Sequence, residues 1–197
     1  MLEYSCDGTG HSGDTGLNSF ALVTYLPDPL KAYLDDLRVS LETDPLPPRA
    51  HLTVLPPRQI ASGASVAQAT AEIAAKLRSW PAFEVVIGGI GIFPGTRVIY
   101  LEIEEGASDL RQMHVDLNGG VLFADERFVF HPHITLAQRL DPAQADSLAR
   151  LAADIWASYT GPRRFFVEQF TFVQNTVDRG WRDLSAHQLS QVSVARL

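Results

Sequence analysis

The chain has a single cysteine, no long apolar run and no excess of positive charge, and each of these absences narrows what the protein can be. Because Cys6 cannot form an internal disulfide, we expect a reducing cytoplasm as the compartment. No stretch approaches the ~20 apolar residues of a membrane span, and the first residues lack the basic start and apolar run of a secretory signal. The net charge of -7 argues against non-specific binding of long nucleic acids over the whole surface.

What the sequence does have is a tetrapeptide pattern that occurs twice. Residues 51–54 read His-Leu-Thr-Val, and residues 133–136 read His-Ile-Thr-Leu. Side chains on an extended strand alternate between its two faces, so the histidine and the threonine of each copy share one face. Each copy therefore offers an imidazole and a hydroxyl to one side, while its two aliphatic residues can anchor the strand in a core.

Hydrophobic periodicity and turn residues predict a repeated order of elements around these two copies. Helices are expected at residues 29–41, 65–80, 108–117 and 142–159, and strands at 20–26, 51–55, 83–87, 98–103, 133–136 and 165–173. The order strand, helix, motif strand, helix, strand occurs twice. The first strand begins near residue 19, which is 32 residues before its histidine, and the corresponding strand begins near residue 98, which is 35 residues before its own. This agreement indicates an internal duplication.

The duplication predicts an α+β fold of two pseudo-symmetric lobes, each an antiparallel sheet with outer helices, and a cleft between the lobes. We expect a single bilobal domain over residues 18–180, with lobe-forming repeats at 18–90 and 97–174. Residues 1–17, which are rich in Ser, Gly, Asp and Thr, are expected to form a flexible N-terminal tail, and residues 181–197 a C-terminal tail.

The two motifs and their surroundings resemble the signature of the two-histidine phosphoesterases. Residues 89–94 read Gly-Ile-Gly-Ile-Phe-Pro, and together with residues 97–101 they are similar to the segment between the motifs in the bacterial and archaeal 2'-5' RNA ligase branch. Residues 130–137, Phe-His-Pro-His-Ile-Thr-Leu-Ala, are similar to the second motif of that branch. The resemblance covers residues 18–174, and it implies the bilobal fold of that family.

The resemblance also implies phosphodiester chemistry on cyclic or 2'-linked phosphates, for which the motif side chains are suited. In-line cleavage of a 2',3'-cyclic phosphate needs a base to activate water and an acid to protonate the departing ribose oxygen. We expect His51 and His133 to supply this pair, without a sign in the sequence of which is the acid. We expect Thr53 and Thr135 to donate hydrogen bonds to the non-bridging oxygens. The predicted activity is metal-independent hydrolysis of 2',3'-cyclic phosphates or 2'-5' linkages in a nucleotide or short RNA.

Arginines that follow the motifs are further candidates for binding the remaining substrate phosphates. Arg58 follows the first motif and Arg139 the second, and either could also be a solvated surface charge. Relatives in the ligase branch tend to carry an arginine five residues after the second motif histidine, where this chain has Gln138. Because acidic residues do not follow either histidine at ligand spacing, we expect no metal and no other cofactor.

Two alternatives stay open at this point. The protein could be a reversible 2'-5' RNA ligase. It could also be a non-catalytic protein that binds nucleotides or RNA and uses the motif side chains only to hold a phosphate. A motif histidine or threonine taken alone could also be a structural residue of a strand, so the matched pair of motifs is what predicts a site. We expect no membrane association and no obligate protein partner.

Overall fold

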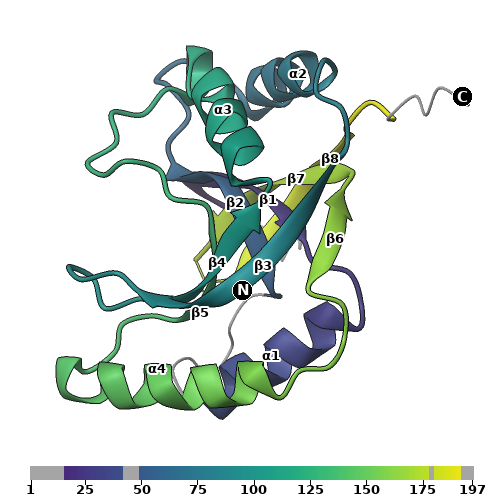
Figure 1. The fold of residues 1–197 in the computed structure, drawn as a ribbon. Helices are drawn as coiled ribbons and strands as arrows, with labels where there is room; N and C mark the ends of the chain where they lie inside the picture. The colour runs from purple at the N-terminus through teal and green to yellow at the C-terminus, as the bar shows by residue number, and fades with distance from the viewer. Residues whose placement is uncertain (1–15, 42–48, 178–179, 192–197) are drawn as a thin grey trace, which may run out of the picture.

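The computed structural model describes residues 16–41, 49–177 and 180–191, which form two antiparallel sheets with four main helices (Figure 1). In chain order the elements are β1 (Gly16–Tyr25), α1 (Leu30–Ser40), β2 (His51–Arg58), α2 (Val66–Leu77), β3 (Phe83–Ile92), β4 (Ile99–Glu105), α3 (Ala107–Leu117), the short helix η1 (Gly120–Leu122), β5 (His133–Ala137), α4 (Pro142–Ala157), β6 (Arg164–Val167), β7 (Gln169–Thr176) and β8 (Trp181–Gln188). The predicted α+β class is confirmed.

The two sheets have corresponding strand orders. One runs β2-β1-β7-β8 and the other β5-β4-β3-β6, and every neighbouring pair within them is antiparallel. Each motif strand, β2 or β5, is thus the edge strand of its sheet and pairs with the first strand of its own repeat. The two motif strands also contact each other where the sheets meet. This pairing brings the two copies of the motif to one place in the molecule.

The two sheets are not formed by the two halves of the sequence, so the predicted division of the chain into lobes needs correction. β3 belongs to the predicted first repeat, yet it pairs with β4 and β6 in the second sheet. β7 belongs to the predicted second repeat and pairs with β1. Each repeat therefore gives its third strand to the other sheet, and the two repeats form one intertwined unit.

The predicted boundaries at the two ends of the domain also need correction. β1 already begins at Gly16, and residues 1–15 of the predicted N-terminal tail lie outside the described residues. β8 lies within the predicted C-terminal tail, yet it pairs with β7 along its length. The ordered domain thus extends past residue 180, while residues 192–197 lie outside the described residues.

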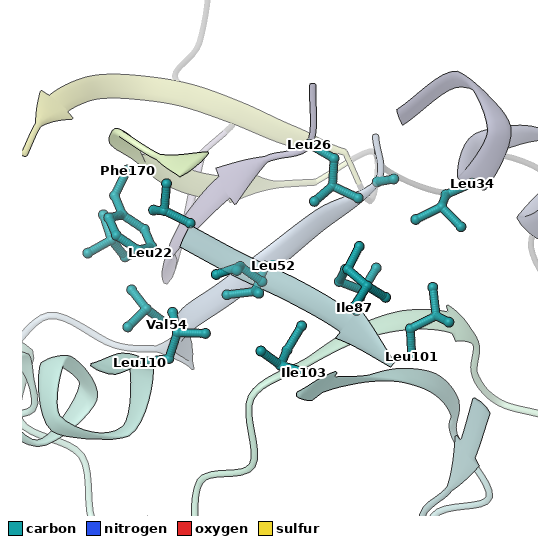
Figure 2. Packing of buried hydrophobic residues seen from close by; sticks show 14 of the residues in the cluster. Leu22, Leu26, Leu34, Leu52, Val54, Ile87, Leu101, Ile103, Leu110 and Phe170 are labelled. Atoms are coloured by element: carbon teal, nitrogen blue, oxygen red, sulfur yellow. The ribbon is translucent and has the colours of Figure 1, made fainter. Parts of the chain in front are cut away.

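A shared hydrophobic core joins the two sheets and fixes the relative positions of the motif strands. Figure 2 shows side chains from both sheets and from α1 and α3 converging. Among its members are Leu22, Leu52, Val54 and Phe170 of the first sheet, Ile87, Leu101 and Ile103 of the second, and Leu34 and Leu110 of the helices. Since each fully buried side chain of this size contributes about 1.5–3 kcal/mol, their packing holds the two sheets together.

Helices of one repeat pack against strands of the other, just as the third strand of each repeat pairs within the other sheet. In Figure 1, α2 and α3 lie together on one side of the strands, and α1 and α4 lie together on the other. α1, from the first repeat, contacts β5, whereas α3, from the second repeat, contacts β2. Each motif strand is therefore packed against a helix of the other repeat. None of the helices in the described ranges has the length and apolar character that crossing a membrane requires.

Candidate functional site

The two motif strands show the same alternation of buried and accessible side chains. In β2, Leu52 and Val54 are fully buried, while His51 and Thr53 are partly exposed. β5 repeats this pattern, since its two aliphatic motif residues are buried and its histidine and threonine are partly exposed. The predicted division of each motif into a core face and an accessible face is confirmed.

The accessible faces of both motifs line one cleft. Its volume is about 990 Å³, and its walls include His51 and Thr53 from β2 and His133 and Thr135 from β5. This is at the upper end of the ~300–1,000 Å³ usual for sites that bind small molecules and cofactors. Two edge strands from different sheets thus present two imidazoles and two hydroxyls to one space.

The two motif histidines are held in the same way by the backbone. His51 Nδ1 lies 2.7 Å from the carbonyl oxygen of Arg49, and His133 Nδ1 lies 2.7 Å from that of His131. A carbonyl oxygen only accepts hydrogen bonds, so Nδ1 carries a proton in both rings. The nitrogen that gains and loses a proton is therefore Nε2 in each histidine, as acid and base catalysis at the cleft would require.

Burial lowers the pKa of both histidines below its usual range. For His51, the hydrogen bond to Arg49 opposes this effect, and the positive charges of Arg38 and His133 lower the pKa further. For His133, the hydrogen bond to His131 opposes the effect of burial, the charge of His131 adds to it, and the charge of Glu102 opposes it. The lowered pKa favours the neutral imidazole, the form that can accept a proton.

Comparison with known proteins assigns the chain to a family. A family model described as the 2'-5' RNA ligase superfamily matches residues 26–179, which is most of the chain. The chain belongs to this superfamily. It is also 35% identical over 71 residues to the "Putative phosphoesterase" of Bacillus cytotoxicus, a match that covers 35% of this chain and 41% of that protein.

Solved structures of other proteins share the fold of this superfamily member. The protein TT0787 of Thermus thermophilus superposes with a TM-score of 0.64 at 23% identity, over 88% of this chain and 99% of that one. LigT of Escherichia coli in complex with ATP gives a TM-score of 0.62 at 20% identity, over 89% and 99%. LigT has also been crystallised with NADP+, phosphate and 3'-AMP. At these identities the likeness shows the fold alone.

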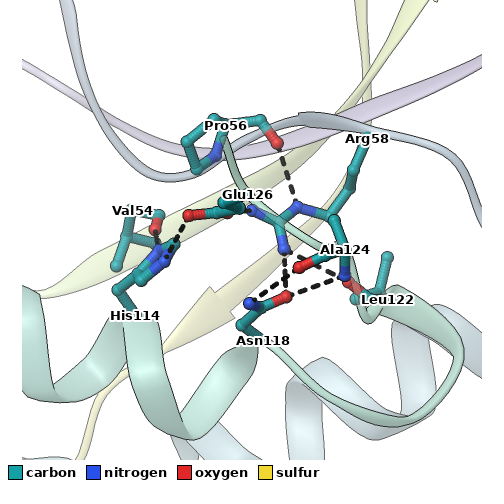
Figure 3. Close-up of polar contacts among 8 residues, drawn as sticks. All are labelled: Val54, Pro56, Arg58, His114, Asn118, Leu122, Ala124 and Glu126. Atoms are coloured by element: carbon teal, nitrogen blue, oxygen red, sulfur yellow. Dashed lines mark hydrogen bonds and ion pairs between the residues drawn. The ribbon is translucent and has the colours of Figure 1, made fainter. Parts of the chain in front are cut away.

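In this superfamily member, Arg58 reaches the cleft wall, but four hydrogen bonds within the protein already hold its guanidinium (Figure 3). Nε donates to the carbonyl oxygen of Pro56 at 3.0 Å. Nη1 donates to Asn118 Oδ1 at 2.7 Å and to the carbonyl oxygen of Leu122 at 3.2 Å, and Nη2 pairs with Glu126 at 2.5 Å. Its side chain is only 2% exposed. These contacts favour a structural anchor over the phosphate ligand that the sequence suggested.

The contacts of Arg58 belong to a larger network that fixes the segment before the second motif. Figure 3 shows His114 between the carbonyl oxygen of Val54, 2.8 Å from Nδ1, and the carboxylate of Glu126, 2.9 Å from Nε2. The His114 ring also stacks on Phe130, with 4.0 Å between ring centroids. The network thus connects the first motif strand to the chain that enters the second. No spacing in the sequence predicted it, since its members lie far apart along the chain.

The other predicted arginine lies outside the cleft. Arg139 lines a separate hollow with Leu41, Asp141 and Gln144, whereas the preceding residue, Gln138, lines the main cleft. The structure therefore brings together His51, His133, Thr53 and Thr135 and does not bring Arg139 to them.

Sequence reasoning missed several side chains that line the cleft. Arg38 comes from α1, where its charge reaches His51, and Trp181 comes from β8, which had been assigned to a tail. Phe128 lines the cleft and is 67% exposed. An arginine within a helical pattern and aromatic residues outside predicted elements give no signal of their own. Within residues 16–41, 49–177 and 180–191, no three His, Cys, Asp or Glu side chains are grouped as a metal site would require.

Proposed function

We propose that the protein is a metal-independent phosphoesterase that hydrolyses 2',3'-cyclic phosphates or 2'-5' phosphodiester linkages of nucleotides or RNA. The observation that carries this proposal is the equivalent placement of His51 and His133 in one cleft, with Nδ1 of each fixed by a carbonyl oxygen. Membership of the 2'-5' RNA ligase superfamily supports the class of reaction.

In the proposed reaction the two histidines act on opposite sides of the phosphorus atom. One neutral imidazole takes a proton from water at Nε2 as the water oxygen bonds to phosphorus. The bond from phosphorus to one ribose oxygen breaks, and the other histidine, protonated at Nε2, gives its proton to that oxygen. The lowered pKa suits the base, because it keeps that imidazole neutral near pH 7, whereas the other histidine must hold its proton against the same effect of burial.

The two threonines have a separate role in this proposal. Thr53 and Thr135 lie next but one to the histidines on the same face of their strands and line the same cleft. Their hydroxyl groups would donate hydrogen bonds to the non-bridging phosphate oxygens. Such donors stabilise the negative charge that develops on these oxygens in the transition state.

A nucleotide or short RNA fits this site as the substrate. The cleft, at about 990 Å³, has room for more than a bare phosphate group, and aromatic side chains such as Phe128 and Trp181 line it. Aromatic faces stack on nucleobases with little preference for sequence. The complexes of LigT with ATP, NADP+ and 3'-AMP support a nucleotide ligand. We keep the cytoplasm as the proposed compartment, since the sequence has a single cysteine.

The description of the superfamily favours 2'-5' RNA ligation as a second candidate. The 5'-hydroxyl of a second RNA would then take the place of water in attacking the cyclic phosphate. The same two histidines would serve, with the base now deprotonating a ribose hydroxyl. An assay that offers both a 2',3'-cyclic end and a 5'-hydroxyl end separates the reactions by their products.

The test is hydrolysis of adenosine 2',3'-cyclic phosphate in excess EDTA, followed by chromatography of the 2'- and 3'-monophosphates. We expect turnover by the wild-type protein and losses of about 10² to 10⁴ in rate in His51→Ala and His133→Ala. His187→Gln is the matched control, because His187 lies on β8 outside the cleft and is bonded to Ser185. Loss of turnover on chelation would overturn the metal-free mechanism, and tight binding without turnover would favour the non-catalytic alternative.

A further inference from the structure

The two motif histidines have equivalent backbones but different partners across the sheet. In the register of β1 and β2, His51 stands opposite Tyr25. In the register of β4 and β5, His133 stands opposite Glu102. Directly opposed residues of an antiparallel pair have Cβ atoms about 4.5–5.5 Å apart on one face. The second motif histidine thus has a carboxylate beside it where the first has a phenol.

The residues two positions before the histidines differ as well. Arg49 precedes His51 and His131 precedes His133, and both supply the carbonyl oxygen that holds Nδ1 of the motif histidine. The side chain of His131 is bound to Glu102, with 2.8 Å between Nε2 and Oε2. Glu102 Oε1 also accepts a hydrogen bond of 3.0 Å from the hydroxyl of Tyr100. One carboxylate therefore fixes the ring of the residue whose backbone orients His133.

At the first motif the corresponding side chain is a permanent cation. Arg49 pairs with Asp183 at 2.8 Å and lies over the ring of Tyr25, with 3.9 Å to its centroid. Tyr25 also donates a 2.5 Å hydrogen bond to Asp183. Asp183 comes from β8, at the far edge of the sheet from β2. Asp183 thus binds the arginine and the tyrosine, while Glu102 at the second motif stands in the strand position opposite the histidine itself.

Charged and titratable groups of both signs surround each of the two rings. Around His133 they are Glu102 and Tyr100 from β4, His131 from the preceding segment and His51 across the cleft, and the uncharged ring of Phe93 lies edge-on at 4.9 Å. Around His51 they are Arg38 and Asp35 from α1, His133, and Arg49 with its partners. The charge of Glu102 raises the pKa of His133 against the larger, opposite effect of His131, and the charge of Arg38 lowers that of His51 against the smaller, opposite effect of Asp35.

We propose that Glu102 and His131 form a positioning pair that makes His133 the general acid, leaving His51 as the general base. The proposal rests on the proposed phosphoesterase function. Glu102 holds the His131 ring, the His131 carbonyl oxygen fixes Nδ1 of His133, and the negative charge of Glu102 favours a proton on Nε2 of His133. At the first motif, the cation Arg38 favours a neutral imidazole, which is the form that a base needs. Glu102 and His131 act through His133 and transfer no proton to the substrate.

A titration of the free protein tests the positioning pair without turnover. Histidine resonances of the wild type and of Glu102→Gln are followed by NMR as a function of pH. Glu102→Gln should lower the titration midpoint of His133 by several tenths of a pH unit and leave that of His51 in place, because a charge beside the ring is removed. Glu104→Gln is the matched control, since it removes the same charge two residues further along β4, at an exposed position outside the cleft, and should move neither midpoint. Equal effects of the two substitutions would overturn the pair.

The dependence of the rate on the leaving group then tests the assignment of roles. Adenosine 2',3'-cyclic phosphate is compared with the analogue that has sulfur in place of the departing ribose oxygen, because a thiolate leaves without needing a proton from an acid. His133→Ala and Glu102→Gln should therefore slow cleavage of the oxygen substrate much more than cleavage of the sulfur analogue, whereas His51→Ala should slow both to the same extent. The opposite pattern, with His51→Ala recovered on the sulfur analogue and His133→Ala not, would make His133 the base and overturn the assignment. Absence of turnover in the wild type would overturn the proposed function and the acid role with it, while the titration still decides the coupling between Glu102 and His133.

Discussion

Replacing Arg58 by alanine should destabilise the fold strongly and leave substrate binding almost unchanged. Arg58 is 2% exposed at its side chain and pairs with Glu126, which is 21% exposed. The substitution removes the Arg58 donor from the carbonyl oxygen of Leu122, and an unsatisfied buried acceptor costs about 1–3 kcal/mol. Oδ1 of Asn118 also loses its bond to Arg58 but keeps the one from the N–H of Ala124. It also removes the guanidinium partner of Glu126, which keeps only its contact with His114.

Together these losses predict that Arg58→Ala lowers the free energy of unfolding by about 3–5 kcal/mol, the range found when one partner of a buried ion pair is removed. Against a total stability of about 5–15 kcal/mol for a typical protein, this change is large. Urea denaturation followed by circular dichroism measures it. The double variant Arg58→Met/Glu126→Gln is the matched control and should recover part of the loss, because no carboxylate is then left without its guanidinium.

The kinetic part of this prediction separates an anchor from a phosphate ligand. At a temperature where Arg58→Ala is still folded, KM for the cyclic phosphate should change by less than about threefold, since four hydrogen bonds hold the guanidinium of Arg58 within the protein. A rise in KM of tenfold or more, together with a loss of stability below about 1 kcal/mol, would refute this reasoning. Arg58 would then be the substrate-binding residue that the sequence suggested.

Four further outcomes follow from the same structure. Thr135→Val keeps the shape of the side chain but removes its hydroxyl. It should lower kcat by about 10²-fold while the thermal unfolding midpoint stays near that of the wild type, and an unchanged kcat would remove the hydroxyl from the mechanism. Leu52→Ala should lower the free energy of unfolding, measured by urea denaturation, by about 2–5 kcal/mol because the side chain is fully buried. The control Val39→Ala replaces a side chain that is 62% exposed and should change this free energy by less than about 0.5 kcal/mol; equal changes would contradict the placement of the core. Because burial lowers the pKa of His51 and His133 in the folded protein, the unfolded chain binds protons first as the pH falls below about 6.5, so the urea midpoint should decrease from pH 7 to 5. A double His51→Gln/His133→Gln variant should lose that part of the pH dependence, and an identical dependence would show that other groups cause it.

Much of the fold could be predicted from local sequence patterns. Alternation within the two motif strands and helical spacing elsewhere gave the order of elements, because each pattern depends only on neighbours along the chain. The exchange of β3 and β7 between the sheets could not be read in this way, since either strand could pair with several partners of similar character. β8 was missed because Trp181–Gln188 is mostly polar and partly exposed, as expected of an edge strand, and so lacks an apolar run.

The sequence predicted the site residues whose side-chain chemistry and strand alternation both point to one face. It did not predict those whose position depends on contacts between residues far apart in the chain. The pairing of the two motifs pointed to one shared cleft, and the cleft holds all four motif side chains. The arginines were chosen by proximity in sequence, yet Arg139 has a positive φ of 58° and lines a different hollow. Arg58 is held by partners 60 to 68 positions away. His51 and His133 differ in the residue that stands opposite each of them, Tyr25 for the first and Glu102 for the second. These partners depend on strand register, which the sequence did not specify.

The most direct test of the account is the single-turnover hydrolysis of adenosine 2',3'-cyclic phosphate by the wild type and by His51→Ala and His133→Ala, in the presence of EDTA. The account predicts conversion to a monophosphate by the wild type, and rates lower by about 10² or more in each variant, with both variants folded by circular dichroism. Equal rates in the wild type and either variant, or no conversion by the wild type at any pH from 5 to 9, would contradict the claim that the two histidines form one phosphoesterase site.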